Sequence, residues 1–245
     1  IVFQLLLGFI IIPFAIIQGF SWPNLAELWP YFLFSTMLYA FGSIMFFKSI
    51  KLIEASEMII LSGAGAIVTM ICAYIFLRER LVMPQYFGAV LVMASIFLVQ
   101  YKKQKFVFGK GALLALVATS LFAFANISDM MIIRTYDAIS YAGVMSLLPG
   151  LMLCLIYFKK MPALIKSTKN TDKNLLAYTA IYSIGVITFY MALAKGAMLS
   201  QVSVICKTNI ILTVIFAAIF IKERDNLWRK ILAAIICMVG VILVA

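Results

Sequence analysis

The sequence contains no histidine, and only 12% of its residues are charged. Without histidine, the Ser-His and Cys-His arrangements of nucleophilic catalysis and most catalytic zinc sites are excluded. The four cysteines stand far apart inside apolar stretches, so we expect small buried side chains there and neither a disulfide nor a metal site. No P-loop is present. These absences argue against an enzyme, and we expect no cofactor.

What the sequence has in excess is apolar residues, which make up 65% of the chain at a mean hydropathy of +1.12. In soluble domains, apolar residues make up roughly 45–50% of the chain. The few charges cluster between apolar runs of ~20 residues, which is the length that crosses a bilayer as a helix. We therefore predict an all-α, multi-pass membrane protein whose nine spans lie at about 1–20, 31–50, 57–77, 84–101, 111–133, 138–158, 174–195, 199–221 and 228–245.

The second half of the chain repeats features of the first at a distance of 144 residues. The positions that match under this shift are Glu79-Arg80 with Glu223-Arg224, Lys51 with Lys195, and Ser56 with Ser200. These matches pair spans two, three and four with spans seven, eight and nine, so the repeat unit is five helices long. A unit with an odd number of helices is inverted in the membrane, which is a transporter architecture.

This repeat predicts two halves, 1–101 and 111–245, within one membrane domain. The second half shows five helices and the first shows four. We therefore expect the opening helix of the first half to precede Ile1, which gives a ten-helix fold of two inverted five-helix repeats.

Two sequence patterns occur once in each half. An apolar span that ends in Glu-Arg is followed by an apolar span with small residues, in YIFLRERLVMPQYFGAVLVMASIFLV and in AIFIKERDNLWRKILAAIICMVGVILV. An aromatic-rich span followed by a lysine and small residues occurs as MFFKSIKLIEASEMII and FYMALAKGAMLSQVSVI. With these patterns the chain resembles the EamA family of the drug/metabolite transporter superfamily over nearly its whole length. The proline expected before each Glu-Arg is absent; Ser62-Gly63-Ala64-Gly65 and Lys207-Thr208-Asn209 stand there instead.

The resemblance implies ten helices and export or uptake of small metabolites, and we expect a secondary transporter in the plasma or inner membrane. Alternating access through a central cavity between the two repeats is the expected mechanism. A flippase for a lipid-linked headgroup is the main alternative, and a non-transporting membrane subunit is another. The expected partners are a small-molecule substrate and membrane lipid, with no nucleic acid, because the net charge of +11 suits an anionic leaflet.

Charged residues inside spans are the first candidates for the transport site, because a charge at mid-bilayer costs roughly 2.5–3.5 kcal/mol. Lys207 lies ~12 Å deep in its span, at 1.5 Å per residue. It aligns with Gly63 in the repeat, and we expect it to receive an anionic or carboxylate-bearing substrate. Asp129 lies about one turn from the end of its span, where it could pair with Lys207 or take part in a proton relay. The alternative is that Asp129 is solvated beside Arg134 at the interface.

Other polar residues are weaker candidates. The polar side chains that we expect to line a cavity are Asn126, Tyr182, Tyr190 and Asn209. The charged residues that we expect to form structural or gating ion pairs are Glu79, Arg80, Glu223 and Arg224. Coupling to protons, to exchange of a second solute or to neither stays open at this point.

Lysine and arginine are spread unequally over the two sides of the membrane. Alternate loops collect fifteen on one side, namely Lys48, Lys51, Lys102, Lys103, Lys105, Lys110, Lys159, Lys160, Lys166, Lys169, Lys173, Lys222, Arg224, Arg229 and Lys230. The other side has four, namely Arg78, Arg80, Arg134 and Lys195. Since short cytoplasmic loops retain positive charge, we predict that the first set is cytoplasmic and that Ala245 is external. The family resemblance implies the opposite orientation.

Overall fold

The computed structural model describes the chain except for residues 78–81, 103–104, 107, 161–172, 197–201, 203–205, 207–208, 223–224 and 245. The helices are α1 (Val2–Ile17), α2 (Leu25–Ile50), α3 (Ala55–Leu61), α4 (Ala64–Leu77), α5 (Met83–Gln100), α6 (Lys110–Ile133), α7 (Ala138–Ile156), α9 (Lys173–Ala194), α11 (Asn209–Phe216) and α12 (Leu227–Val244). The described residues also include two short helical turns, η1 (Phe158–Lys160) and η2 (Ala217–Ile221). A small hairpin is formed by β1 (Tyr101–Lys102) and β2 (Lys105–Phe106). The prediction of an all-α protein is confirmed, since strands among these residues are confined to that hairpin.

Four helices in the described part of the chain are long and apolar enough to cross a membrane, namely Ala26–Ile50, Lys110–Ile133, Ala138–Ile156 and Lys173–Ala194. Val2–Ile17, Met83–Val99 and Asn209–Ile221 are apolar but shorter. Large apolar side chains are exposed on several helices, and Phe220 is 76% exposed. Soluble proteins rarely expose apolar surface so widely. Nine membrane crossings stay a prediction.

The chain divides into two compact units that do not coincide with its two sequence halves. One unit holds Ile1–Ala40 and Ser128–Met198, and the other holds Phe41–Ile127 and Leu199–Ala245. Helices α2 and α6 contribute to both units, because two of the three boundaries fall inside them. Each unit therefore contains helices from the first half and from the second.

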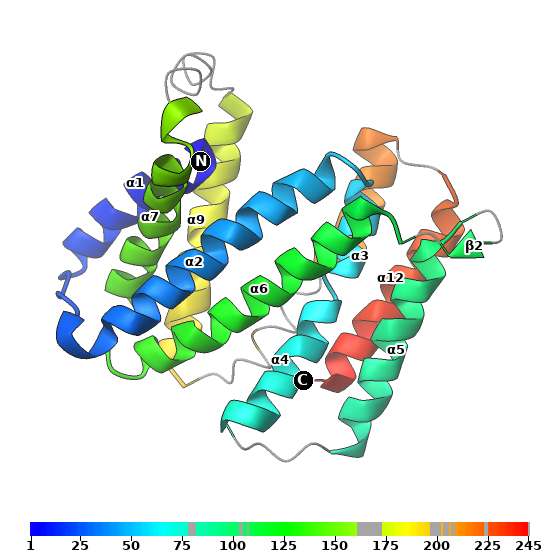
Figure 1. Cartoon of the computed structure of the whole chain (residues 1–245), viewed down its shortest axis with the longest axis horizontal. Coiled ribbons are helices and arrows are strands. Elements are labelled where there is room, and N and C mark those ends of the chain that lie inside the picture. The colour runs from blue at the N-terminus through cyan, green and yellow to red at the C-terminus, as the bar shows by residue number, and fades with distance from the viewer. Residues whose placement is uncertain are drawn as a thin grey trace. The chain divides into compact units, whose positions relative to one another are not determined.

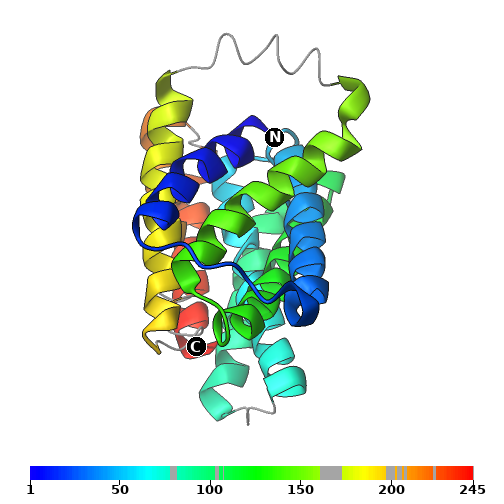
Figure 2. The same ribbon diagram turned by 90° about the vertical axis from the view of Figure 1, so that its left-hand side faces the viewer.

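In the first unit, α1 packs closely along α7, and both contact α9 (Figures 1 and 2). Small residues allow this close approach. A Cβ on Gly8 would lie 2.8 Å from the Cβ of Leu147, and one on Gly150 would lie 3.1 Å from a methyl group of Leu5. Without a hydrophobic driving force inside lipid, helices associate through such close van der Waals contact.

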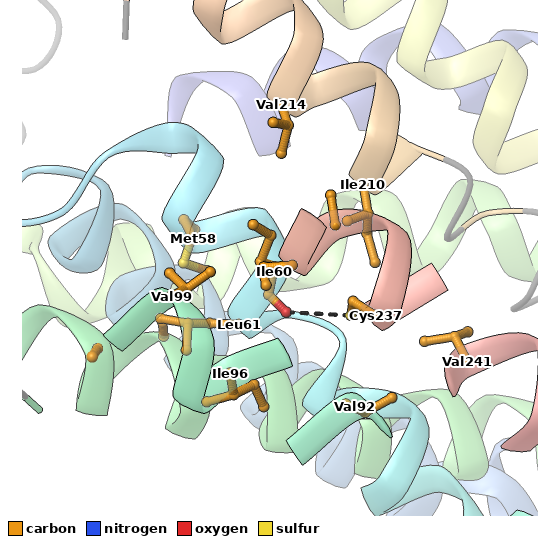
Figure 3. Packing of buried hydrophobic residues seen from close by; sticks show 14 residues of the cluster. Met58, Ile60, Leu61, Val92, Ile96, Val99, Ile210, Val214, Cys237 and Val241 are labelled. Carbon is orange, nitrogen blue, oxygen red and sulfur yellow. Dashed lines mark hydrogen bonds between the residues drawn. The ribbon is translucent and has the colours of Figure 1, made fainter. Parts of the chain in front are cut away.

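The second unit is built on the pairing of α5 with α12, which is the most extensive helix contact among its described residues. Its buried core brings together side chains from α3, α5, α6, α11 and α12 (Figure 3). Gly240 of α12 lies against α5 so closely that an added Cβ would be 2.8 Å from the backbone oxygen of Gly88. Cys237 is buried in this core, whereas Cys206 is exposed, so the expectation of a buried cysteine is wrong at that position.

The predicted span at 57–77 is interrupted within its first third. Helix α3 ends at Leu61, and α4 begins at Ala64. The Ser62 hydroxyl donates to the carbonyl of Ile59 at 2.6 Å, and the amide of Gly63 donates to the carbonyl of Ile60 at 3.0 Å. Serine side chains compete in this way for helix carbonyls. A Cβ on Gly63 would collide with the sulfur of Cys237, so glycine permits the close approach of α12 at the break.

Candidate functional site

A carboxylate is buried inside the first unit. Asp129 lies in α6, four residues before the helix ends at Ile133, and it is fully buried. A charge in this position requires polar partners, because hydrocarbon and apolar side chains offer no hydrogen bonds. Asp129 is therefore not solvated beside Arg134, which is exposed.

Four hydroxyl groups supply those partners. The Ser35 and Tyr141 hydroxyls donate to Oδ1 of Asp129 at 2.7 and 2.5 Å. The Tyr39 and Tyr190 hydroxyls donate to Oδ2 at 2.6 and 3.0 Å. Hydrogen bonds to a charged acceptor are shorter and stronger than those between neutral groups. We call these five residues the hydroxyl cage.

Four helices of the first unit meet at the hydroxyl cage. Helix α6 brings the carboxylate, α2 brings Ser35 and Tyr39, α7 brings Tyr141, and α9 brings Tyr190. Ser35 and Tyr39 are four residues apart, so they lie on one face of α2. The cage therefore depends on how these four helices pack, and a movement of any of them changes the hydrogen bonds of Asp129.

The turn between α6 and α7 fixes where Tyr141 enters the cage. The Asp137 carboxylate caps α7 by accepting from the amide of Ser140 at 2.7 Å. The Tyr136 hydroxyl donates to the carbonyl of Ser21 at 2.9 Å, and the Ser21 amide donates to the Ser140 hydroxyl at 3.1 Å. Burial raises the pKa of Tyr136 to about 12, so its hydroxyl stays a donor at neutral pH. These bonds hold the first turn of α7, and with it Tyr141, in place.

Aromatic contacts orient the tyrosines of the cage. The rings of Tyr141 and Tyr190 meet edge to face with their centroids 5.2 Å apart, and Phe32 lies 5.6 Å from Tyr141. Edge-to-face contacts of this kind are favourable. They restrict ring rotation, so the hydroxyls are held toward the carboxylate.

A second polar feature lies in the second unit. Lys230 of α12 forms an ion pair with Glu54, which precedes α3, and Lys230 is buried. The pair borders a pocket of about 160 Å³ whose lining residues are Glu54, Glu57, Val99, Asp225, Asn226, Arg229 and Lys230. We call this the charged pocket.

The structure brings only part of the predicted site together. Of these residues, Tyr190 donates a hydrogen bond to Asp129. Tyr182, also on α9, is 45% exposed, and Asn126 is half-buried on the part of α6 that belongs to the second unit. Asn209 is the exposed first residue of α11. The predicted residues that lie outside the described part of the chain are Lys207, Glu79, Arg80, Glu223 and Arg224.

The family model for the EamA-like transporter family matches the chain twice, over residues 1–101 and 109–245. The chain belongs to the EamA-like transporter family. Membership in this family makes it an integral membrane protein and a transporter of the drug/metabolite superfamily. The resemblance that the two Glu-Arg patterns indicate is thereby confirmed.

A solved structure shares the fold of this EamA-family chain. It is described only as the crystal structure of a protein, and it superposes with a TM-score of 0.66 at 16% sequence identity. The match covers 97% of this chain and 84% of that one. No curated protein is significantly similar to the chain. The substrate of this EamA transporter therefore has to be approached from its own residues.

Sequence reasoning misses three members of the hydroxyl cage in this EamA transporter. Ser35 is a small polar residue in an apolar run, and Tyr141 stands at the start of a span, where tyrosines usually face the lipid interface. The available signal was the four-residue spacing of Ser35 and Tyr39, which places two hydroxyls on one helix face.

Proposed function

We propose that this EamA-family protein is a secondary transporter that moves a small polar metabolite across the cell membrane by alternating access between two inverted repeats. The observation that carries the proposal is the double match of one family model, to 1–101 and to 109–245. Two halves of one ancestry, each with an odd number of helices, would face opposite sides of the membrane and could close alternately around a site.

Helix packing supports this arrangement. Helix α1 overlaps α7 when the sequence is shifted by 144 residues, so each is the second helix of its half, and the two pack together. Likewise, α5 packs against α12, its equivalent in the 144-residue repeat, and α3 packs against α11, which belongs to the equivalent span. Contacts between equivalent elements are what a two-fold relation between the halves would produce.

The interruption at Ser62-Gly63 also supports transport. It lies ~11 Å along the span from Ala55, at 1.5 Å per residue, which is roughly a third of the way to Leu77. Discontinuous helices form the substrate sites of many secondary transporters. In the sequence repeat, Lys207 is the position equivalent to Gly63 of this break. We propose that Lys207 receives an anionic or carboxylate-bearing substrate, with Asn209 beside it.

The hydroxyl cage is the second element of the proposed pathway. Ionisable residues within membrane spans mark substrate or ion paths, because a buried charge without a function is expensive to keep. Asp129 cannot be explained as a lipid-facing or solvated residue, since it is fully buried. We propose that the cage belongs to the part of the transporter that changes between the two access states.

A screen in proteoliposomes tests the proposed function. The purified protein is reconstituted, and uptake of a panel of small amino, carboxylic and sugar metabolites is compared with empty vesicles. We expect saturable uptake of at least one polar solute and its loss in Lys207→Met. Movement of a labelled lipid between leaflets, without solute uptake, would favour the flippase alternative. Absence of both activities in folded protein would contradict the proposal.

A further inference from the structure

The acceptor positions of the Asp129 carboxylate are fully used. Oδ1 and Oδ2 each accept two hydrogen bonds, at donor distances between 2.5 and 3.0 Å. A metal ion or an organic cation could reach either oxygen only by displacing a hydroxyl. A proton is small enough to bind without displacing any of them.

The chemistry of the donors suits both protonation states. Lysine, arginine and amide N–H groups can only donate, so a cage made from them would serve the anion alone. A hydroxyl both donates and accepts. When Asp129 carries a proton, its own O–H can donate to a tyrosine oxygen of the cage, and that tyrosine turns its hydrogen to another acceptor. The cage can therefore hold a carboxylate and a carboxylic acid in the same packing.

No fixed cation offsets the charge of Asp129 within the described residues. The titratable groups that face it are Tyr39 from α2, Tyr141 from α7 and Tyr190 from α9. Helix α1, which packs on α7 and α9, carries no ionisable side chain. Proton uptake at Asp129 thus changes the charge of this buried site from −1 to 0. A buried neutral carboxyl costs much less free energy than a buried carboxylate, so loss of the charge makes it easier for the site to move between water and a low-dielectric surrounding.

From this geometry we infer that Asp129 is the proton-binding site that couples solute transport to a proton gradient, an inference that rests on the proposed transport function. In each cycle one proton adds to a carboxylate oxygen of Asp129 from the water on one side and is released to water on the other. The tyrosine hydroxyls keep the neutral and charged forms hydrogen-bonded between these events. No covalent bond other than the O–H bond forms or breaks.

Infrared spectroscopy tests proton binding without a known substrate. The C=O stretch of a protonated carboxyl is followed in the reconstituted protein while the pH is changed from alkaline to mildly acidic. We expect a band that appears on acidification and is lost in Asp129→Asn. Glu27→Gln, which changes an exposed carboxylate in the first turn of α2, should keep the band.

Two infrared outcomes would overturn the inference. The first is the absence of any Asp129-dependent band. The second is a band that Asp129→Asn removes but that does not change with pH, since a permanently protonated carboxyl cannot carry protons.

Transport measurements separate this inference from the proposed function. For a solute found in the screen, we expect an imposed pH gradient to drive accumulation by the unaltered protein, whereas Asp129→Asn should only equilibrate the solute. Accumulation that ignores the pH gradient, or that follows sodium instead, would overturn proton coupling and leave the transport function intact. Failure to find any transported solute would count against the proposed function, while the infrared result would still decide proton binding at Asp129.

Discussion

At Asp129, each hydroxyl of the cage contributes separately to the stability of a buried charge. The Tyr141 hydroxyl is the closest donor, at 2.5 Å. Hydrogen bonds to charged groups contribute about 1.5–3 kcal/mol, and Tyr141→Phe removes one of them while leaving the ring in place. We expect Tyr141→Phe to lower the free energy of unfolding by that amount, measured by unfolding in mixed micelles with circular dichroism.

Tyr178→Phe is the matched control for this substitution. Tyr178 is 55% exposed, and its ring contacts Phe3 and Tyr182 at centroid distances of 5.3 and 5.9 Å, both of which phenylalanine retains. We expect a change below about 0.5 kcal/mol for this exposed site. Equal effects of the two substitutions would mean that the hydroxyl of Tyr141 does not stabilise the carboxylate.

The residues of the cage show what sequence can and cannot predict at this scale. Asp129 stands out because a charge in an apolar run is costly, whatever its partners. Tyr190 was one of several equivalent polar candidates, and Tyr182 from the same helix proved exposed. The spacing of Ser35 and Tyr39 indicates a shared helix face but not its partner, and Tyr141 has no signal at all, because the cage depends on the distance between helices that are far apart in the sequence. The fit of side-chain ridges into grooves between packed helices sets that distance, and it cannot be derived from the hydropathy pattern.

At the scale of helices, the contact between α5 and α12 depends on the absence of a side chain at Gly240. A Cβ there would lie 2.8 Å from the backbone oxygen of Gly88 and from Val92. Since a backbone oxygen cannot turn aside, Gly240→Ala forces the two helices apart. Overpacking of this kind costs roughly 1–3 kcal/mol. We expect that loss in the free energy of unfolding, together with a weaker contact between α5 and α12 in cysteine cross-linking.

Gly185→Ala provides the comparison for Gly240→Ala. Gly185 also lies inside a helix, α9, but nothing lies within 4 Å of an added Cβ. Alanine is the better helix former by roughly 0.5–1 kcal/mol, so we expect unchanged or slightly higher stability. Destabilisation of similar size at both positions would show that helix propensity, and not the contact with α5, decides the effect.

The ion pair between Glu54 and Lys230 joins the start of α3 to the start of α12. Lys230 is 10% exposed in its side chain and Glu54 is 38% exposed, so solvent screens the carboxylate more than the ammonium. Removing one partner leaves the other charge only partly compensated. We expect Glu54→Gln and Lys230→Met each to cost about 1–2 kcal/mol, a value between those of exposed and buried pairs.

A double-mutant cycle checks this ion pair. The double variant Glu54→Gln/Lys230→Met should lose less stability than the two single variants together, because the second substitution removes a charge that has already lost its partner. Strict additivity would mean that the contact contributes nothing beyond the packing of each side chain. The same variants in the transport assay would show whether this contact limits the rate of the cycle.

Helix positions were predicted well where the apolar run and its flanking charges agree. The span at 111–133 corresponds to α6 (Lys110–Ile133), and that at 138–158 to α7 (Ala138–Ile156). The interruption at Ser62-Gly63 was not predicted, because hydropathy is continuous across it. A local hydroxyl bond from Ser62 to the helix backbone accompanies that break, and the close approach of Cys237 to Gly63 is a tertiary contact that hydropathy does not reveal.

At the scale of the whole molecule, the sequence repeat and the compact units divide the chain at different places. The repeat was visible in the sequence because equivalent positions keep similar residues, such as the two Glu-Arg pairs. The units could not be predicted, because each combines helices from both halves, and the boundaries cut through α2 and α6. Whether a helix belongs to one unit or the other depends on which helices it packs against. The hydropathy pattern carries no information about these contacts.

The orientation of the whole chain is the last prediction, and it follows from the unequal distribution of fifteen and four basic residues. In a variant without native cysteines, a single cysteine is placed at Lys166 or at the exposed Thr135, in the turn between α6 and α7. In intact cells, we expect an impermeant maleimide to label Thr135→Cys and to leave Lys166→Cys unmodified. After permeabilisation, both positions should react.

The reversed labelling pattern would establish the orientation that the family resemblance implies. The answer also decides from which side Asp129 receives its proton, because Asp129 lies about one turn from the end of α6, next to the turn that holds Thr135. If that turn is external, the cage lies near the outer surface. The proton then comes from the nearer, outer side under an inward gradient, and the fifteen basic residues remain on the opposite side, beside the anionic cytoplasmic leaflet.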